Sequence, residues 1–242
     1  MRLSSQGKEL FIAASRDLGL NLTGQFELFD QLFDLLTESN QKMNLTGLTS
    51  EPEIVLKHFI DSLSCLRSNR LEGTLRVIDV GTGAGFPGLP LCIARPQLEV
   101  VLIDATRKKI GFVEKVLEAL ALPNAYTLWG RAEDLGHQTA HREEYDRVVT
   151  RAVSTLSTLY ELCLPLLRVG GYLIAQKGVE AQSEVAASGT ALEKLGGKLV
   201  ESVWLELPII GDSRCLVIVE KTSPTPAKYP RRPGMPEKNP LS

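Results

Sequence analysis

The sequence predicts an α/β protein whose central sheet is mostly parallel. Apolar runs of strand length alternate with stretches of helical periodicity from residue 75 onward, and this alternation indicates parallel strands with helices on both faces. The last two apolar runs are separated by only about nine residues, too few for a crossover helix, so we expect an antiparallel hairpin. A glycine-rich turn follows the first run, where open α/β sheets bind ligands.

The elements are justified in order along the chain by their apolar spacing. Helices are expected at 6–18 and 24–43, where apolar residues recur every three or four positions, and Pro52 begins a third helix near 51–67, at a position that tolerates proline. Strands are expected at 75–80, 99–103, 125–129, 146–150, 171–176, 199–205 and 215–219. Further helices are expected at 88–94, 107–121, 155–167 and 180–195.

The same patterns divide the chain into three parts. A helical subdomain is expected over residues 1–70 and a sheet domain over residues 71–222. Residues 223–242 form a basic tail with six prolines and no apolar periodicity, which is typical of an extended segment.

Composition excludes several classes of protein. The net charge of −2 is not that of a general nucleic-acid binder, so any RNA contact must come from local basic patches. No apolar run reaches the ~18 residues of a membrane span, and the N-terminus has no apolar signal segment. The four cysteines lie far apart beside only three histidines, which disfavours a metal site. We therefore expect a cytoplasmic protein, a monomer, without a bound metal.

The glycine turn, VIDVGTGAGFPG, contains Asp79 followed by Gly81, Gly83 and Gly85. Its GAGFPG segment matches the dinucleotide pattern G-x-G-x-x-G, so a nicotinamide cofactor is one interpretation. However, a carboxylate beside the turn is unfavourable for a pyrophosphate and favourable for a cationic ligand. S-adenosylmethionine is such a ligand, and Asp104, after the next strand, is placed to accept hydrogen bonds from its ribose. A turn that only packs a strand against a helix is the third alternative.

Several segments together resemble one known family. They are NLTGLTS, HFIDSL, VIDVGTGAGFPGLPL, LIDATRKKIGFV, GRAEDL, VVTRAVSTL, AQKG and KYPRRPGMPEKNPL. From about residue 40 onward the chain resembles the ribosomal RNA small subunit methyltransferase G family, formerly called glucose-inhibited division protein B. The resemblance implies a class I (Rossmann-like) S-adenosylmethionine-dependent methyltransferase fold behind an N-terminal helical region. It also implies methylation of a guanine at N7 in 16S rRNA of the small ribosomal subunit.

The resemblance assigns donor contacts by matching motif. Asp79 and Gly83 belong to the predicted donor loop, and Arg151 matches an arginine near the donor. The remaining predicted donor contacts are Gly81, Phe86, Asp104, Ala105, Thr106, Ala132 and Glu133. The family's Lys-Arg pair after the second strand is Lys108-Lys109 here, a departure that replaces a bidentate cation with a point charge.

Methylation of guanine N7 requires no general base, because N7 carries a lone pair and no proton. Catalysis should then come mostly from positioning, and the candidate residues are Arg151, Lys177, His58 and Asp61. His58 and Asp61 either fix the helical subdomain against the sheet or bind the base. Lys177 either holds an RNA phosphate or is a surface lysine. The predicted RNA contacts are Arg107, Lys108, Lys109, Tyr229, Arg231 and Arg232.

Two other classes remain open from the sequence. An NAD-dependent oxidoreductase would use the same glycine turn, although the chain shows no evident catalytic set for hydride transfer. A non-catalytic nucleotide-binding protein would keep the loop without the chemistry.

Overall fold

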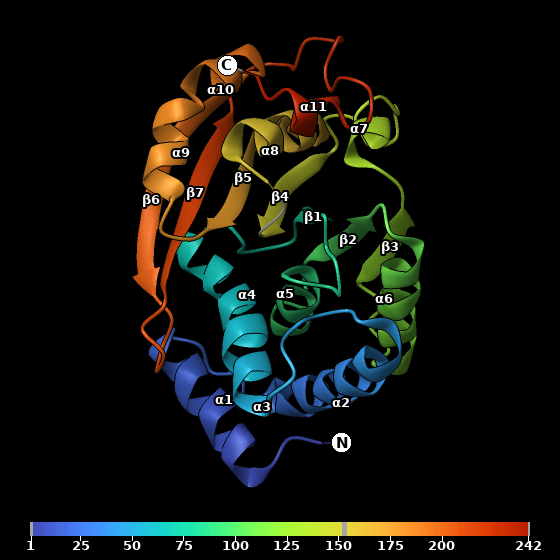
Figure 1. Cartoon of the computed structure of the whole chain (residues 1–242), viewed down its shortest axis with the longest axis vertical. Coiled ribbons are helices and arrows are strands. Elements are labelled where there is room, and N and C mark those ends of the chain that lie inside the picture. The colour runs from blue at the N-terminus through green and yellow to red at the C-terminus, as the bar shows by residue number, and fades with distance from the viewer. Residues whose placement is uncertain (1, 152–153, 242) are drawn as a thin grey trace.

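The computed structural model describes residues 2–151 and 154–241, and within them a seven-stranded sheet has the order β3-β2-β1-β4-β5-β7-β6 (Figure 1). β7 runs antiparallel to both β5 and β6, whereas the other pairs are parallel. The predicted sheet and its terminal hairpin are confirmed. The strands are β1 (Arg76–Val80), β2 (Glu99–Asp104), β3 (Ala125–Trp129), β4 (Tyr145–Arg151), β5 (Leu167–Lys177), β6 (Gly197–Glu206) and β7 (Ser213–Lys221).

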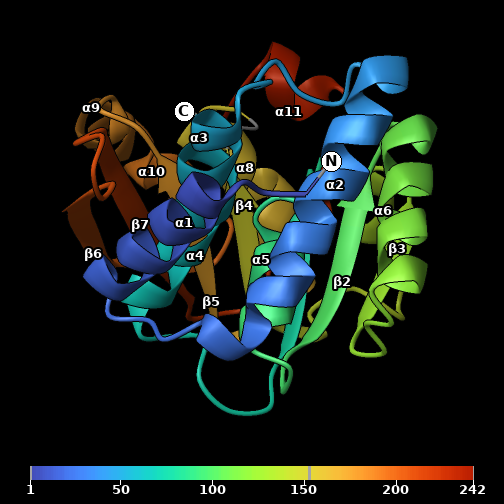
Figure 2. The ribbon, with the colours of Figure 1, turned by 90° about the horizontal axis from the view of Figure 1, so that it is seen from below.

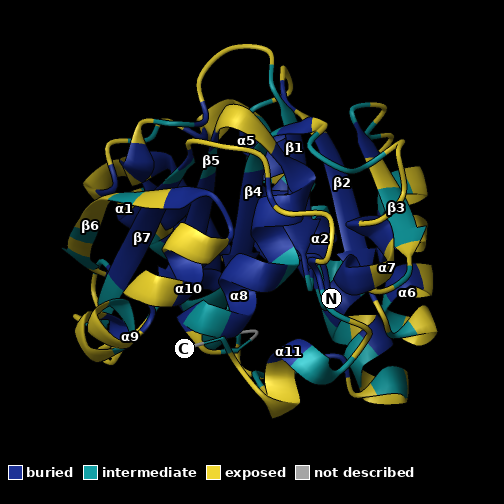
Figure 3. Cartoon of the chain, turned by 90° about the horizontal axis from the view of Figure 1, so that it is seen from above, coloured by how far each residue is buried: buried dark blue, intermediate teal, exposed yellow. Residues whose placement is uncertain are grey.

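Helices cover both faces of the sheet, as Figures 2 and 3 show from opposite sides. On one face lie α1 (Ser5–Asp17), η1 (Thr23–Gln25), α2 (Phe26–Met43), the continuous helical run α3 (Glu51–Glu53), η2 (Ile54–Ile60), α4 (Asp61–Leu63) and η3 (Ser64–Ser68), and then α5 (Gly88–Ala94) and α6 (Arg107–Ala119). On the other lie α7 (Ala132–Leu135), α8 (Leu156–Cys163), η4 (Leu164–Leu166), α9 (Ala181–Ala187), α10 (Gly189–Lys194) and α11 (Met235–Lys238). The four-residue α7 and α11 escaped prediction because one turn shows no periodicity.

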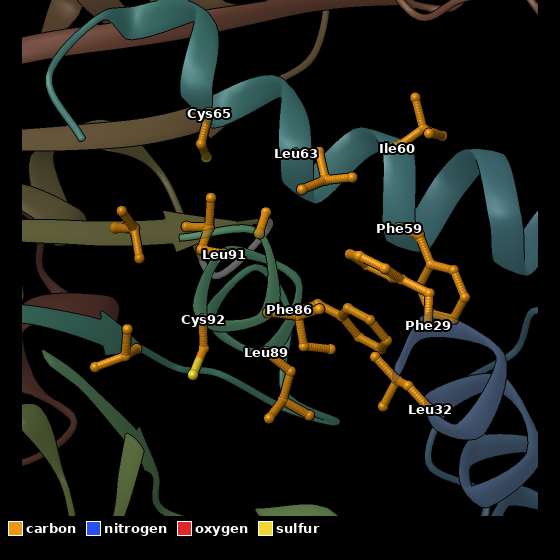
Figure 4. Packing of buried hydrophobic residues seen from close by; sticks show 14 of the residues in the cluster. Phe29, Leu32, Phe59, Ile60, Leu63, Cys65, Phe86, Leu89, Leu91 and Cys92 are labelled. Atoms are coloured by element: carbon orange, nitrogen blue, oxygen red, sulfur yellow. The ribbon is translucent and has the colours of Figure 1, made fainter. Parts of the chain in front are cut away.

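The N-terminal helices share a hydrophobic core with the sheet. The Phe11 and Phe29 ring centroids are 4.6 Å apart, and Phe29 lies 5.5 Å from Phe59 of η2. Figure 4 shows Phe29 and Phe59 on the side of α5 where Phe86 and Leu89 lie. Burial of this apolar surface therefore holds residues 2–70 as a layer on the sheet rather than as a separately packed unit.

The C-terminal tail packs on the opposite face. Thr225 is buried, and the Tyr229 ring belongs to the hydrophobic cluster formed with α8 and β5. A chain segment without apolar periodicity is thus held by a few anchoring side chains and by hydrogen bonds. Within the described residues no helix is both long and apolar enough to cross a membrane, and no three metal-ligating side chains gather.

Candidate active site

The glycine turn after β1 has a backbone that only glycine adopts easily. Gly81, Gly83 and Gly85 have φ values of +74°, +60° and +94°, in the left-handed region. The turn is anchored from beneath by Asp79, whose Oδ2 accepts hydrogen bonds from Thr82 Oγ1 (2.6 Å) and from the Gly88 amide (2.8 Å). The loop is therefore held open at the carboxyl edge of the sheet by a single buried carboxylate.

The structure corrects the predicted role of Asp79. Its side chain is fully buried and lines none of the cavities described below, so it does not face a cationic ligand. Burial raises the pKa of Asp79 to about 7, against the lowering effect of its hydrogen bonds from Thr82 and Gly88. The sequence motif predicts a ligand contact for Asp79, whereas its side chain instead stabilises the conformation of the glycine turn.

An inner cavity of about 180 Å³ opens where β1, β2 and β3 end. Asp104 lies at its centre, with Oδ2 accepting from the Gly83 amide (3.0 Å) and Oδ1 from the Thr106 amide (2.7 Å). Thr106 thus orients Asp104 and does not itself line the cavity. The predicted donor residues that do line it are Gly81, Asp104, Ala105, Ala132 and Glu133.

The chemistry of the inner cavity suits an adenosine group better than a pyrophosphate. Asp104 and Glu133 bring two carboxylates to the wall, and carboxylates accept hydrogen bonds from ribose hydroxyls and from an adenine amino group. A pyrophosphate would meet these negative charges instead of the amide donors that it requires. The residues present therefore fit S-adenosylmethionine and disfavour a dinucleotide.

A second cavity of about 450 Å³, the loop cavity, lies along the glycine turn and shares Gly81 and Asp104 with the inner cavity. Gly83 and Phe86 line it, as predicted for donor contacts. Lys109, predicted to contact RNA, lines it too, with Nζ 4.0 Å from Asp104 Oδ2. We therefore place Lys109 with the donor site.

A third cavity of about 530 Å³, the outer cavity, gathers all four candidate catalytic residues: Arg151, Lys177, His58 and Asp61. Arg151 and His58 also line the loop cavity, so these two side chains lie where the two cavities adjoin. Arg151 Nη1 donates to the Lys57 carbonyl (2.9 Å) and to Asp61 Oδ2 (3.3 Å). The helical segment of residues 57–61 thereby fixes the position of the Arg151 side chain, which belongs to β4.

Asp61 joins that helical segment to three strands. Arg214 Nε on β7 donates to Asp61 Oδ1 (3.2 Å), and Gln176 Nε2 on β5 donates to the Asp61 carbonyl (2.6 Å). Asp61 therefore links the helical region to the sheet, which is one of its two predicted roles. Arg214 and Gln176 also line the outer cavity and were missed. Arg214 lies outside every motif quoted above, and in the AQKG segment the candidate was Lys177 rather than Gln176.

His58 orients Arg151 as a neutral acceptor. Arginine can only donate, so the contact of 3.0 Å from Arg151 Nη2 makes His58 Nδ1 the acceptor. The proton is then on Nε2, which donates to Thr46 Oγ1 at 2.7 Å. Burial and the neighbouring Arg151 lower the pKa of His58 to about 3, and its ring stacks on Phe86 with centroids 4.4 Å apart.

The lowered pKa of His58 predicts acid lability. The unfolded chain binds this proton below pH 6.5 and the folded protein only near pH 3, so stability is lost as the pH falls between these values. Between pH 7 and pH 4.5 the parent protein should lose about 3 kcal/mol of unfolding free energy through His58, and His58→Asn should not show this loss. Urea unfolding of both proteins across this range measures it. Unfolding free energies that change in parallel with pH for the two proteins would contradict the lowered pKa of His58.

Lys177 does not present a free ammonium to RNA. Its Nζ donates to the Ser154 carbonyl (2.8 Å) and pairs with Glu184 Oε2 (2.8 Å), and its side chain is only 11% exposed. Glu184 in turn accepts from the Leu156 amide (2.8 Å). This corrects the predicted phosphate contact, because Lys177 binds Ser154 directly and the start of α8 through Glu184.

The predicted RNA contacts separate into exposed and occupied side chains. Arg107 lies 5.0 Å over the exposed Trp129 ring, and Lys108 and Arg232 are exposed. Tyr229 is 8% exposed, so its ring is not presented for base stacking. The Arg231 guanidinium is taken by Glu161 Oε2 at 2.7 Å. Tyr229 and Arg231 are therefore corrected from RNA contacts to anchors of the tail.

The fold is that of known methyltransferases. A SAM-dependent methyltransferase from Aquifex aeolicus superposes with a TM-score of 0.54 at 20% identity, over 71% of this chain and 94% of that one. TrmN from Thermus thermophilus gives a TM-score of 0.52 at 22% identity, over 67% and 48%. With β7 antiparallel between β5 and β6 and cavities at the carboxyl edge of the sheet, the chain has the fold of the class I S-adenosylmethionine-dependent methyltransferases.

Sequence comparison narrows this class. Residues 25–208 match the family model described as rRNA small subunit methyltransferase G. The Ribosomal RNA small subunit methyltransferase G of Deinococcus radiodurans is 48% identical over 239 residues, covering 99% of this chain and 94% of the relative. That of Pelotomaculum thermopropionicum is 46% identical over 228 residues, covering 94% and 95%. The chain belongs to the rRNA small subunit methyltransferase G family.

Proposed function

We propose that this protein transfers the methyl group of S-adenosylmethionine to N7 of a guanine in 16S rRNA. Membership of the family makes it an S-adenosylmethionine-dependent methyltransferase of small-subunit ribosomal RNA. The target atom and the roles of individual residues are the proposal, and they rest on the three adjoining cavities.

The inner and loop cavities would hold the donor. Asp104 would accept hydrogen bonds from the ribose, and Glu133 would accept one from the adenine amino group, beside Ala105 and Ala132. The glycine turn and Phe86 would contact the amino-acid part in the loop cavity. Bound there, S-adenosylmethionine supplies a methyl group on a sulfonium, and the protein supplies its position.

The outer cavity would hold the target guanine. Arg151 lies between this cavity and the donor site, so its guanidinium is placed to meet a base that enters for methylation. Guanine presents two acceptors, N7 and O6, on one edge, whereas adenine presents the N6 amino donor in place of O6. An arginine that donates to O6 would therefore favour guanine and leave N7 directed at the donor.

The observation that carries the proposal is that none of the candidate catalytic residues at this junction is a free base. His58, with its pKa lowered to about 3, has Nδ1 occupied by Arg151. Both Asp61 oxygens accept from arginines, and Lys177 Nζ is bonded on two sides. A hydroxyl or amino target would need a proton removed. Guanine N7 needs only alignment of the lone pair, worth roughly 7–11 kcal/mol when well made.

RNA contact is proposed for the exposed cations beside the cavities. Arg107 and Lys108 begin α6 at the carboxyl edge of the sheet, and Arg232 lies on the tail. With a net charge of −2 the protein lacks a general attraction to RNA, so these local contacts favour docking on a structured ribonucleoprotein.

Transfer of labelled methyl to small subunits from a strain lacking this enzyme tests the proposal. Nucleoside mass spectrometry should find 7-methylguanosine, and large subunits treated in parallel should stay unlabelled. Label in any other nucleoside would contradict the N7 assignment. No label, with S-adenosylhomocysteine still bound, would refute the substrate but keep the donor site.

The remaining predictions concern organisation and location. We propose a cytoplasmic monomer organised as residues 1–70, 71–222 and 223–242. The packing of both terminal parts on the sheet supports treating them as layers around one methyltransferase core.

A further inference from the structure

The C-terminal tail forms part of the inner cavity. Gly234, Pro236 and Glu237 line it together with Asp104 and Glu133, although they lie about a hundred residues farther along the chain. Figure 1 shows α11 beside α7 and α8. We call residues 231–237 the tail wall.

A buried ion pair sets the position of the tail wall. Glu161 on α8 is fully buried, and its Oε1 accepts from the Arg231 amide (2.8 Å) and from Arg231 Nε (2.9 Å). Its Oε2 accepts from Arg231 Nη2 at 2.7 Å. One carboxylate thus binds both the backbone and the side chain of Arg231, which fixes where the tail begins to cross the cavity.

Two hydrogen bonds then seat the wall on residues of the same cavity. The Gly234 amide donates to Glu133 Oε1 (2.9 Å), and Thr158 Oγ1 donates to the Pro236 carbonyl (3.0 Å). Gly234 has a φ of +80°, a conformation that glycine adopts without strain. Glu133, a proposed adenine contact, is therefore itself oriented by the tail.

The chain leading into the wall is braced as well. Arg142 Nη1 donates to the Tyr229 carbonyl (2.9 Å), and Arg142 Nη2 donates to the Thr225 carbonyl (2.6 Å). His137 Nε2 lies 2.6 Å from the Pro230 carbonyl oxygen. Bonds before, at and after Arg231 leave the wall little freedom to move, so it is formed before a ligand arrives.

We infer that the tail wall is part of the donor-binding site and that Glu161 and Arg231 are positioning residues for S-adenosylmethionine. The inference rests on the proposed function, in which the inner cavity holds the adenosine end of the donor. Glu161 seats Arg231, Arg231 places Gly234, and Gly234 orients Glu133 toward the cavity. Neither member of the ion pair needs to touch the donor.

The expected effect is a loss of donor affinity. Apparent affinity falls in proportion to the fraction of molecules whose site can bind. If the tail wall is in place in about one-tenth of the molecules, the apparent Kd rises about tenfold. Arg231→Met should therefore raise the Kd for S-adenosylhomocysteine, and the KM for S-adenosylmethionine, by about this factor. The KM for small subunits should stay unchanged.

Calorimetric titration with S-adenosylhomocysteine measures this. Arg168→Met is the matched control, because Arg168 Nε pairs with Asp146 Oδ1 (2.6 Å) in an exposed pair outside the cavities. Arg231→Lys keeps a charge for Glu161 but not the fork that binds both of its oxygens, so its Kd should lie between those of the parent and Arg231→Met.

The outcomes of this titration distinguish a failure of the tail-wall inference from a failure of the proposed donor site. A parent protein that does not bind S-adenosylhomocysteine would refute the proposed donor site. A parent that binds, with a folded Arg231→Met that binds equally well, would overturn the tail wall alone. Should Arg231→Met fail to fold, amide hydrogen exchange of the parent protein with and without S-adenosylhomocysteine tests the inference instead. The ligand should protect amides of 231–238 and not those of β6, and absence of this protection overturns the inference.

Discussion

Arg151→Lys is expected to lower kcat/KM for methyl transfer by about 100-fold, the cost of a small misplacement at a reacting centre. Arg151 makes three directed contacts, to the Lys57 carbonyl, Asp61 and His58. Lysine retains the charge but not the planar fork that satisfies these partners together. The ammonium would therefore not be held at the boundary between the loop and outer cavities.

Steady-state kinetics with small subunits measure this effect, and calorimetry measures the donor Kd separately. Because the ribose and adenine contacts remain, the donor Kd should rise by less than about tenfold. Arg168→Lys, at an exposed ion pair away from the cavities, is the matched control. A folded Arg151→Lys protein with parental kcat/KM would show that Arg151 orients neither ligand nor base.

Asp79→Ala is expected to weaken donor binding by about tenfold or more, whereas Asp79→Asn should keep it within about threefold. Alanine leaves the Thr82 hydroxyl and Gly88 amide without their acceptor, and unpaired buried groups cost about 1–3 kcal/mol each. Asparagine keeps an oxygen for both donors. If Asp79 instead attracted the sulfonium by charge, both variants would lose affinity equally.

The same pair of variants carries a pH signature. The folded pKa of Asp79, about 7, lies above its ordinary value of 3.8. The folded protein thus holds the proton to higher pH than the unfolded chain, and stability declines as the pH rises between the two values. Relative to the parent, Asp79→Asn should gain about 3 kcal/mol in unfolding free energy from pH 5 to pH 8. Denaturant unfolding at both pH values measures this gain, and parallel curves would contradict it.

Local patterns predicted the fold well because they depend on near neighbours. The alternation of strands and helices and the short connection before β7 specify the sheet and its hairpin. The short α7 and α11 lie below the length at which periodicity is visible. The tail reads as a segment unable to form a core, yet Tyr229 and Arg231 anchor it to partners on α8 and in the cluster beneath.

The site was predicted unevenly, and the errors share a cause. A charged residue in a motif was assigned to a ligand because no motif or periodicity marks the partner that it has in the fold. Arg231 pairs with Glu161, Lys177 with Glu184, and Asp79 holds a loop nine residues farther on. Residues predicted at strand ends, such as Asp104 and Arg151, line one cavity because parallel strands end at one edge.

By itself the sequence determined the fold, the donor loop, the family and the edge of the sheet where chemistry takes place. These follow from spacing, glycine conformation and motifs that are contiguous along the chain. Only the tertiary structure decided which charged side chains line a cavity and which pair with one another. It also decided that residues of the tail line the inner cavity. The physical reason is that a buried charge requires a partner, and its partner is set by packing in three dimensions rather than by order along the chain.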